Sequence, residues 1–306
     1  MSLLLAAAVL AGGGEFAVVG YLPEYRLDVV RGADLRPCTD LVYFSLLPNA
    51  DGSLPEIGEV TRDRLRKLKT AADARLLVCV GGWGKSDRFA AVCGDDERRS
   101  RLVGEFASLC EGDLFDGVDL DWEHPRDDVE QRLYATLLVE TAAALHRQGD
   151  LCTAAIAPWK PLTADAVSAI DRVHLMSYDH AFPHATLAKS EADLKAVADV
   201  PAEKLCLGVP FYGRNADRDA SMYRDLAGRP LKSSDITAEG YAFNGPETIA
   251  AKVRLAKTRG LAGVMIWEVG QDAVGELSLL RVIGREAGRT VDFGRRENRG
   301  TPARVD

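Results

Sequence analysis

The chain has 306 residues, a length that fits either two domains of ~150 residues or one closed α/β barrel of ~250 residues. Apolar residues make up 47% of the chain and charged residues 27%, which excludes a fully disordered, fibrous or multi-span membrane protein. The 38 Lys plus Arg and 46 Asp plus Glu give a net charge of -8, which argues against nucleic acid as a partner because nucleic-acid binding depends on clustered cations. A neutral ligand is favoured.

The first eleven residues, MSLLLAAAVLA, form an apolar run that is too short to span a bilayer. Such a run is typical of the central part of a secretion signal, and small residues would precede a cut at Gly12. No Lys or Arg precedes the run, so a frayed N-terminus is the alternative. We expect residues 1–11 to be a signal peptide of a secreted or periplasmic protein without membrane association, in which disulfides could form.

Cysteine and histidine spacing gives no sign of a metal site. The six cysteines include no C-x-x-C pair. Three of them lie in apolar runs and are expected to be small buried hydrophobes: Cys79, Cys152 and Cys206. His180 and His184 are four residues apart, but Pro183 between them argues against a helix that would place both on one face. We expect no metal and no cofactor.

Short runs rich in Val, Ile, Leu and aromatic residues recur eight times, at intervals of roughly 20 to 50 residues. They cover residues 16–22, 40–46, 76–81, 117–122, 151–157, 172–178, 204–211 and 262–267. Segments with helical periodicity lie between or after them, at 61–74, 98–110, 129–147, 246–257 and 273–285. Strands that alternate with helices predict a parallel sheet, and eight such strands can close a barrel.

The alternative, a doubly wound sheet, would need a glycine-rich phosphate turn after an early strand, and no G-x-G-x-x-G occurs there. We therefore predict an α/β fold, a (β/α)8 TIM barrel formed by residues 16–289 as a single domain. The charged segment 290–306 contains Gly300 and Pro302 and is expected to be a flexible tail.

The end of the fourth strand carries an unusual series of acids. It reads DGVDLDWE, with Asp119, Asp121 and Glu123 at a spacing of two, which points all three into the barrel. Like charges in a low-dielectric interior raise one another's pKa, so at least one acid must hold a proton. The outermost acid, Glu123, is favoured as a proton donor near neutral pH. Trp122 has the opposite parity and is expected to pack outside.

This segment resembles the D-x-x-D-x-D-x-E signature of glycoside hydrolase family 18, the chitinases and endo-β-N-acetylglucosaminidases. Further motifs match in the expected order: VGY at 19–21, VGGW at 80–83, MSYD at 176–179, GVPFYG at 208–213 and GVMIWE at 263–268. The resemblance covers about residues 16–285.

The resemblance implies a mechanism in which the 2-acetamido oxygen of the substrate attacks the anomeric carbon in place of an enzyme carboxylate. Glu123 would protonate the glycosidic oxygen and later activate water. Asp121 would orient the acetamido N–H and stabilise the oxazolinium ion, and Asp119 would share a proton with Asp121. Tyr178 would donate its hydroxyl to the acetamido oxygen, with Asp179 in the same pocket.

The resemblance also implies substrate-binding residues. Trp267 would form the floor under the sugar at the cleavage point. Met176 is also expected to bind the substrate. Tyr21 is expected to line the pocket, and Tyr212 is expected to reach its rim. For Trp83, a sugar platform and plain packing at the barrel rim are both open.

Two departures from the family pattern stand out. Cys79 occupies a position where the family usually has Ser. Only 47 residues, 215–261, separate the seventh and eighth strands, so the full α+β insertion of larger chitinases does not fit there.

We therefore predict a retaining glycosidase that acts on β-1,4-linked N-acetylglucosamine in oligo- or polysaccharides, and that functions as a monomer. One alternative is an endo-β-N-acetylglucosaminidase acting on N-glycans or peptidoglycan. An alternative of another class is a non-catalytic chitinase-like lectin, which the presence of Glu123 disfavours.

Overall fold

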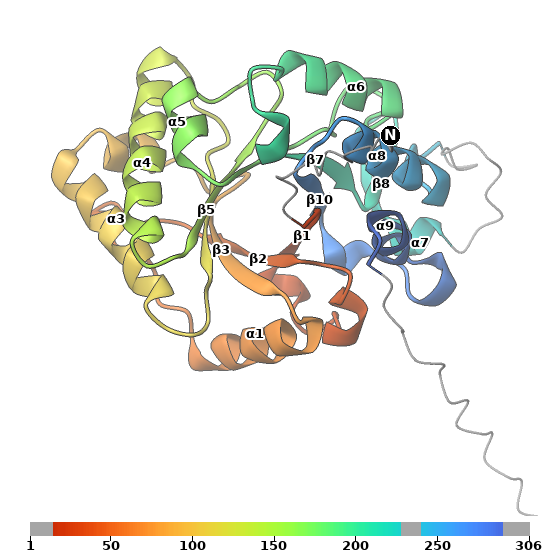
Figure 1. Ribbon diagram of the computed structural model, residues 1–306, viewed down its shortest axis with the longest axis horizontal. Coiled ribbons are helices and arrows are strands. Elements are labelled where there is room, and N and C mark those ends of the chain that lie inside the picture. Colours follow the sequence, from red (N-terminus) through yellow and green to blue (C-terminus); the bar gives the residue numbers. More distant parts are fainter. Residues whose placement is uncertain (1–14, 228–239, 290–306) are drawn as a thin grey trace, which may run out of the picture.

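The computed structural model describes residues 15–227 and 240–289. Within these ranges, parallel strands close into a barrel in the order β1-β10-β7-β6-β5-β4-β3-β2, and helices surround it (Figure 1). The predicted (β/α)8 barrel is confirmed. The barrel strands are β1 (Ala17–Pro23), β2 (Asp40–Leu46), β3 (Arg75–Gly81), β4 (Gly117–Asp121), β5 (Leu151–Ile156), β6 (Arg172–Leu175), β7 (Leu205–Pro210) and β10 (Gly263–Trp267).

The α-helices lie mainly in the connections between strands. They are α1 (Glu59–Ala72), α2 (Phe89–Cys93), α3 (Asp96–Cys110), α4 (Asp128–His146), α5 (Ala164–Ala169), α6 (Leu187–Ala196), α7 (Tyr223–Leu226), α8 (Pro246–Thr258) and α9 (Leu279–Ala287). Short 3-10 turns cover Glu24–Arg26, Gly32–Leu35, Ala202–Lys204, Val269–Gln271 and Gly275–Leu277. The sequence analysis did not predict the shorter helices α2, α5, α6 and α7, in which few turns of apolar periodicity can be recognised.

Side chains on the barrel strands alternate between two apolar regions. On β1, Val18 and Leu22 pack against the helices, whereas Val19 and Tyr21 pack inside the barrel. Strands that are covered on both faces need apolar residues at nearly every position, which explains the continuous runs in the sequence. All six cysteines are buried and unpaired, which confirms the expectation that Cys79, Cys152 and Cys206 are small core residues.

The connection between β7 and β10 holds a small elaboration instead of a full insertion. Its described part contains an antiparallel pair, β8 (Tyr212–Arg214) and β9 (Ala220–Met222), followed by α7 and later by α8. The segments predicted to be a signal peptide, 1–11, and a flexible tail, 290–306, lie outside the described residues. Over the described ranges, we find no helix with both the length and the apolar character that a membrane crossing needs.

Candidate active site

The acids of the candidate site lie at the carboxyl end of β4. Asp119 and Asp121 are buried on the strand, and Glu123 follows two residues beyond its end. Trp122 points the other way and stacks on Phe89, with ring centroids 5.2 Å apart. Strand alternation therefore separates the acids, on the inner face, from the tryptophan that packs outside the barrel.

Asp119 is fully buried, and both of its carboxylate oxygens are bound. Tyr21 donates to Oδ2 at 2.7 Å and Thr153 donates to Oδ1 at 2.5 Å. His174 Nδ1 lies 3.1 Å from Oδ1. Burial by itself raises the pKa of Asp119, but His174 and the two hydroxyl donors outweigh burial and lower it below its ordinary value. Asp119 is therefore ionised.

Asp121 has the opposite electrostatic character. It is 3% exposed, and its Oδ1 has no hydrogen-bond partner in the described part of the chain. Burial, followed by the charges of Glu123 and Asp119, raises its pKa well above the ordinary value. Its environment therefore favours the protonated form more than water does. Within the described residues, the hydroxyls bound to Asp119 come from Tyr21 on β1 and Thr153 on β5, and the proton shared with Asp121 that the resemblance implied stays a prediction.

Glu123 lies at the outer end of the series. Its side chain is 13% exposed, and burial, followed by the negative charge of Asp179, raises its pKa to about 7. The backbone N–H of Glu123 donates to Ser86 Oγ at 2.9 Å, which ties the acid to the loop that follows β3. His124 Nε2 lies 3.7 Å from its Oε2. Glu123 is thus a buried acid that keeps its proton close to neutral pH.

The two glycines of the VGGW motif allow the chain to pass close beside β4. Gly81 and Gly82 have φ angles of +104° and +102°, which residues with a side chain rarely adopt. A Cβ at Gly81 would lie 2.2 Å from the backbone oxygen of Asp121, and one at Gly82 would lie 2.2 Å from a phenylalanine ring of β2. The turn brings Trp83 to the site, where its backbone N–H faces the carboxylate of the outer acid.

Tyr178 follows the end of β6 and is buried, with 7% of its surface exposed. Its hydroxyl points to Met265 Sδ at 3.8 Å. Thioether sulfur is a weak acceptor, so the hydroxyl hydrogen remains available for a stronger acceptor such as a ligand carbonyl.

Asp179, the next residue, has a left-handed backbone with φ of +61°. Arg214 donates to its Oδ1 at 2.5 Å and to its Oδ2 at 3.0 Å, and the Tyr212 hydroxyl donates to Oδ1 at 2.7 Å. Burial raises the pKa of Asp179, but the contacts from His184, Arg214 and Tyr212 outweigh burial and hold it well below its ordinary range. Asp179 is therefore ionised and its carboxylate is held in place.

Aromatic side chains surround the acids. Trp267 ends β10 half-buried and packs edge-on against Phe44, with ring centroids 4.7 Å apart. Trp83 is 78% exposed and Trp159, after β5, is 59% exposed. The Trp159 ring lies edge-on to the His124 ring, with ring centroids 5.8 Å apart. An inner tryptophan and two exposed ones therefore border the acids.

Three residues predicted to contact the substrate present little surface. Tyr21 is 1% exposed and Tyr212 is 5% exposed, and their hydroxyls bind Asp119 and Asp179 respectively. Met176 is half-buried against the interior apolar cluster. The structure places the two tyrosines beneath the accessible layer, where they support the acids.

The sequence analysis missed four residues that shape the site: Ser86, Thr153, His174 and Arg214. Thr153 and His174 are polar residues within apolar strand runs. A polar residue that interrupts such a run is a sequence signal for a functional side chain inside the barrel. Arg214 lies two residues after Tyr212 on β8, so strand parity places both on the same face. Nothing in the sequence singles out Ser86.

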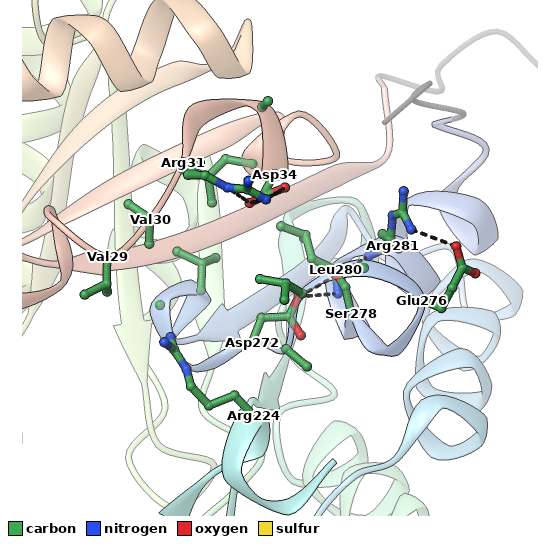
Figure 2. A pocket seen from close by; sticks show the side chains of 17 residues that line it. Val29, Val30, Arg31, Asp34, Arg224, Asp272, Glu276, Ser278, Leu280 and Arg281 are labelled. Carbon is green, nitrogen blue, oxygen red and sulfur yellow. Dashed lines mark hydrogen bonds and ion pairs between the residues drawn. The ribbon is translucent and has the colours of Figure 1, made fainter. Parts of the chain in front are cut away.

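A separate cavity of about 710 Å³ lies between the loops that follow β1 and β10 (Figure 2). Arg31 pairs with Asp34 there, and Arg281 pairs with Glu276. None of the acids of the candidate site lines it. Over the described ranges, no three His, Cys, Asp or Glu side chains cluster as metal ligands would.

Comparison with known proteins gives a consistent result. The family model described as "Glycosyl hydrolases family 18" matches residues 17–272. Endochitinase 1 of Metarhizium robertsii is 25% identical, over 72% of this chain and 67% of that protein. Chitinase 1 of Aphanocladium album is 26% identical, over 69% of this chain and 65% of that protein. The chain therefore spans about two thirds of the length of these fungal relatives.

Solved structures share the fold. The GH18 chitinase ChiB from the chitin utilization locus of Flavobacterium johnsoniae matches with a TM-score of 0.78 and 25% identity, over 90% of this chain and 94% of that one. The GH18 chitinase from Cycas revoluta, solved in complex with (GlcNAc)3, matches with a TM-score of 0.73 and 22% identity, over 89% and 98%.

Proposed function

Because the chain belongs to glycosyl hydrolase family 18, we propose that it is a glycosidase that cleaves β-1,4-linked N-acetylglucosamine in chitin oligosaccharides, with retention of configuration. The observation that carries this proposal is the protonation pattern at the end of β4. Glu123, with a pKa raised to about 7, lies outside Asp121, whose pKa is raised well above its ordinary value, and Asp119, whose pKa is lowered. A carboxylic acid that keeps its proton near neutral pH is what cleavage of a glycosidic bond requires.

The substrate's acetamido group is proposed as the nucleophile. Asp179 is the nearest candidate for a carboxylate nucleophile, but Arg214 binds both of its oxygens. Two groups suit an acetamido group: Asp121 Oδ1, which has no partner within residues 15–227 and 240–289, can accept its N–H, and the Tyr178 hydroxyl can donate to its oxygen. Holding this oxygen against the anomeric carbon makes the first step intramolecular.

The half-buried Trp267 supplies the floor for the sugar at the cleavage point. Its indole contacts Phe44 through an edge-on arrangement, which leaves the ring supported from one side. A sugar ring would stack on the free part of the indole surface.

The test is turnover of chitotetraose by the wild type and by Glu123→Gln, with a high-mannose glycopeptide as a second substrate. The wild type should cleave chitotetraose and release a product that is initially the β anomer by NMR. Glu123→Gln keeps the size of the side chain but removes the acid, so kcat should fall by ~10²–10⁴ while oligosaccharide binding persists.

Glu203→Gln is the matched control, because Glu203 is exposed at the opposite end of the barrel, before β7, and should leave turnover unchanged. An initial α product, or near-normal turnover by a folded Glu123→Gln protein, would contradict the proposal. Cleavage of the glycopeptide alone would reassign the substrate to N-glycans.

Export, a role in chitin breakdown outside the cytoplasm and a monomeric state belong to the same proposal. The apolar run of residues 1–11 supports export. Cell fractionation and sedimentation of the purified protein test these points.

A further inference from the structure

A single carboxylate on α6 binds both ends of the short segment that carries Tyr178 and Asp179. Ser177 Oγ lies 2.6 Å from Asp193 Oδ2, and His180 Nε2 lies 2.8 Å from the same oxygen. Asp193 is 6% exposed, so these contacts are shielded from water. The two residues between the contacts are the two that face the acids of β4.

The contacts at Asp193 Oδ2 have consistent donors and acceptors. A serine hydroxyl has one hydrogen, and Ser177 donates it to the carboxylate, so Ser177 accepts from Ser190 Oγ at 2.9 Å. Ser190 and Asp193 are three residues apart on α6 and therefore share a face. His180 must carry its hydrogen on Nε2 to bind the carboxylate. Hydrogen bonds to an ionised acceptor are stronger than neutral ones.

The remainder of this connection is fixed by other groups. Lys189 donates to the carbonyl of Pro183 at 2.7 Å, and Lys252 and Asn244 donate to the carbonyl of Ala185 at 2.9 and 2.8 Å. None of these contacts reaches Tyr178 or Asp179. The backbone N–H groups of Ser177 and His180 bond to the carbonyls of Leu175 and His184, at 2.9 and 3.1 Å, and Asp193 adds a side-chain link between these two flanking residues.

The backbone at Asp179 has a reason to need such a restraint. Its φ of +61° lies in the left-handed region, which is less favourable for residues that carry a Cβ than for glycine. Arg214 and Tyr212 hold the carboxylate of Asp179, but they do not hold its backbone. Contacts at the flanking residues favour the strained arrangement over a relaxed one.

We propose that Asp193 is a positioning residue: by binding Ser177 and His180 together, it holds the Tyr178 hydroxyl and the Asp179 carboxylate in register with the acids on β4. The inference rests on the proposed glycosidase activity for its kinetic consequence. Its structural consequence, the placement of the Asp179 charge near Glu123, holds in the free protein without substrate.

The test compares Asp193→Ala and Asp193→Asn with the wild type. Alanine removes both contacts, whereas asparagine keeps one neutral acceptor, so asparagine should have the smaller effect. We expect kcat on chitotetraose to fall ~10- to 100-fold for Asp193→Ala, as for other losses of alignment, with a much smaller change in KM.

A second readout is the titration of Glu123 in the free protein, followed by NMR of ¹³C-labelled glutamate carboxyls and assigned with Glu123→Gln. Titratable groups surround Glu123 from several elements: Asp121 on β4, Cys79 on β3, Tyr178 and Asp179 after β6, and His124 next in the chain. If Asp179 is no longer held near Glu123, its charge raises the pKa of Glu123 less, so the midpoint should fall by at least ~0.3 pH units in Asp193→Ala.

Asp171→Ala is the matched control. Asp171 also binds a histidine, His146, at 3.0 Å, and accepts from the backbone N–H of Cys152 at 2.8 Å, but it lies at the other end of β6. Its loss should lower thermal stability and leave kcat and the Glu123 midpoint unchanged.

The outcomes separate the two proposals. A wild type without glycosidase activity, together with the expected midpoint shift in Asp193→Ala, would refute the function and support the positioning role. The positioning role would be overturned if Asp193→Ala kept the kcat of the wild type and an unchanged Glu123 midpoint. It would also be overturned if Asp171→Ala changed kcat and the Glu123 midpoint as much as Asp193→Ala does. If Asp193→Ala does not fold, Asp193→Asn and Ser177→Ala decide in the same way.

Discussion

The acids of this site have different protonation states because each has different neighbours. Asp119 is ionised through three donors, and Asp179 is ionised through Arg214 and its other contacts. Asp121 Oδ1 has no partner among the described residues, and burial with two neighbouring acids raises the pKa of Asp121, while the pKa of Glu123 is raised to about 7. Such a division lets one acid donate a proton while its neighbours keep fixed charges or hydrogen bonds.

Replacing Asp179 with Asn should shift the alkaline limit of activity to lower pH. Glu123 acts as a proton donor, so kcat/KM should fall as the pH rises through its pKa of about 7. Burial is the main cause of that raised pKa, and the charge of Asp179 adds to it. Without the charge, the pKa of Glu123 moves toward that of an ordinary glutamate, and a pH profile of kcat/KM measures the change.

The position of the alkaline limit is the informative quantity, since the substitution also lowers kcat through the lost contact with Arg214. A limit that stays in place in Asp179→Asn would mean that burial alone sets the pKa of Glu123. Lys189→Ala serves as a control, because Lys189 contacts the carbonyl groups of the same connection but not the acids.

The spacing of the acids was readable from the sequence, but their partners were not. The period of two along β4 predicts that Asp119, Asp121 and Glu123 face inward, whichever strands lie opposite. Thr153 and His174 meet Asp119 only because the barrel closes, over sequence separations of 34 and 55 residues. A single sequence contains no local signal for contacts of that kind.

The elements follow the predicted order, and the boundary errors have local causes. The sixth strand was predicted to reach residue 178, but β6 ends at Leu175, because the Ser177 N–H bonds back to the Leu175 carbonyl at 2.9 Å and turns the chain. The last helix was predicted from residue 273, but α9 begins at Leu279. Gly275, with φ of +74°, interrupts the helical backbone, and Ser278 caps the helix by accepting from a backbone N–H.

The opposite faces of the strands give two tryptophans different roles. Trp267→Ala should weaken oligosaccharide binding, because the half-buried indole is the proposed floor for the sugar at the cleavage point. Trp122→Ala should instead lower the free energy of unfolding by about 3–5 kcal/mol, because this indole is 4% exposed and stacks on Phe89. Binding titrations and urea unfolding of both variants measure the two effects. Equal effects on binding and on stability from the two substitutions would contradict the assignment of faces.

Polar groups follow the axis of the barrel from one end to the other. At the amino ends of the strands, Arg172 on β6 donates to both oxygens of Asp40 on β2, each at 3.0 Å. These two strands lie opposite each other in the closed order, so the pair spans the barrel. Asp119 and its donors occupy the middle, and the acids of the site occupy the carboxyl ends. The site therefore rests on a barrel that is closed at its far end by an ion pair.

Replacing Asp40 with Asn should lower the free energy of unfolding by about 3 kcal/mol near neutral pH without changing kcat, because it leaves Arg172 buried and without its charged partner. Burial raises the pKa of Asp40, but Arg172 and then Arg75 outweigh burial and lower it. An aspartate with a lowered folded pKa contributes stability above its unfolded pKa of ~3.9, and that contribution is lost as the pH falls through the folded value.

The difference between wild type and Asp40→Asn should therefore depend on pH in one direction only. Protonated aspartate and asparagine have nearly the same shape and no charge, so acid makes the wild type resemble the variant. The measurement is urea unfolding of both proteins at a series of pH values. The difference between their free energies of unfolding should stay constant from neutral pH down to ~5 and narrow progressively below ~4. If the difference in free energy of unfolding persists unchanged in acid, the asparagine side chain acts through packing and not through the lost charge. A loss of kcat at neutral pH would show that the far end of the barrel is coupled to the site.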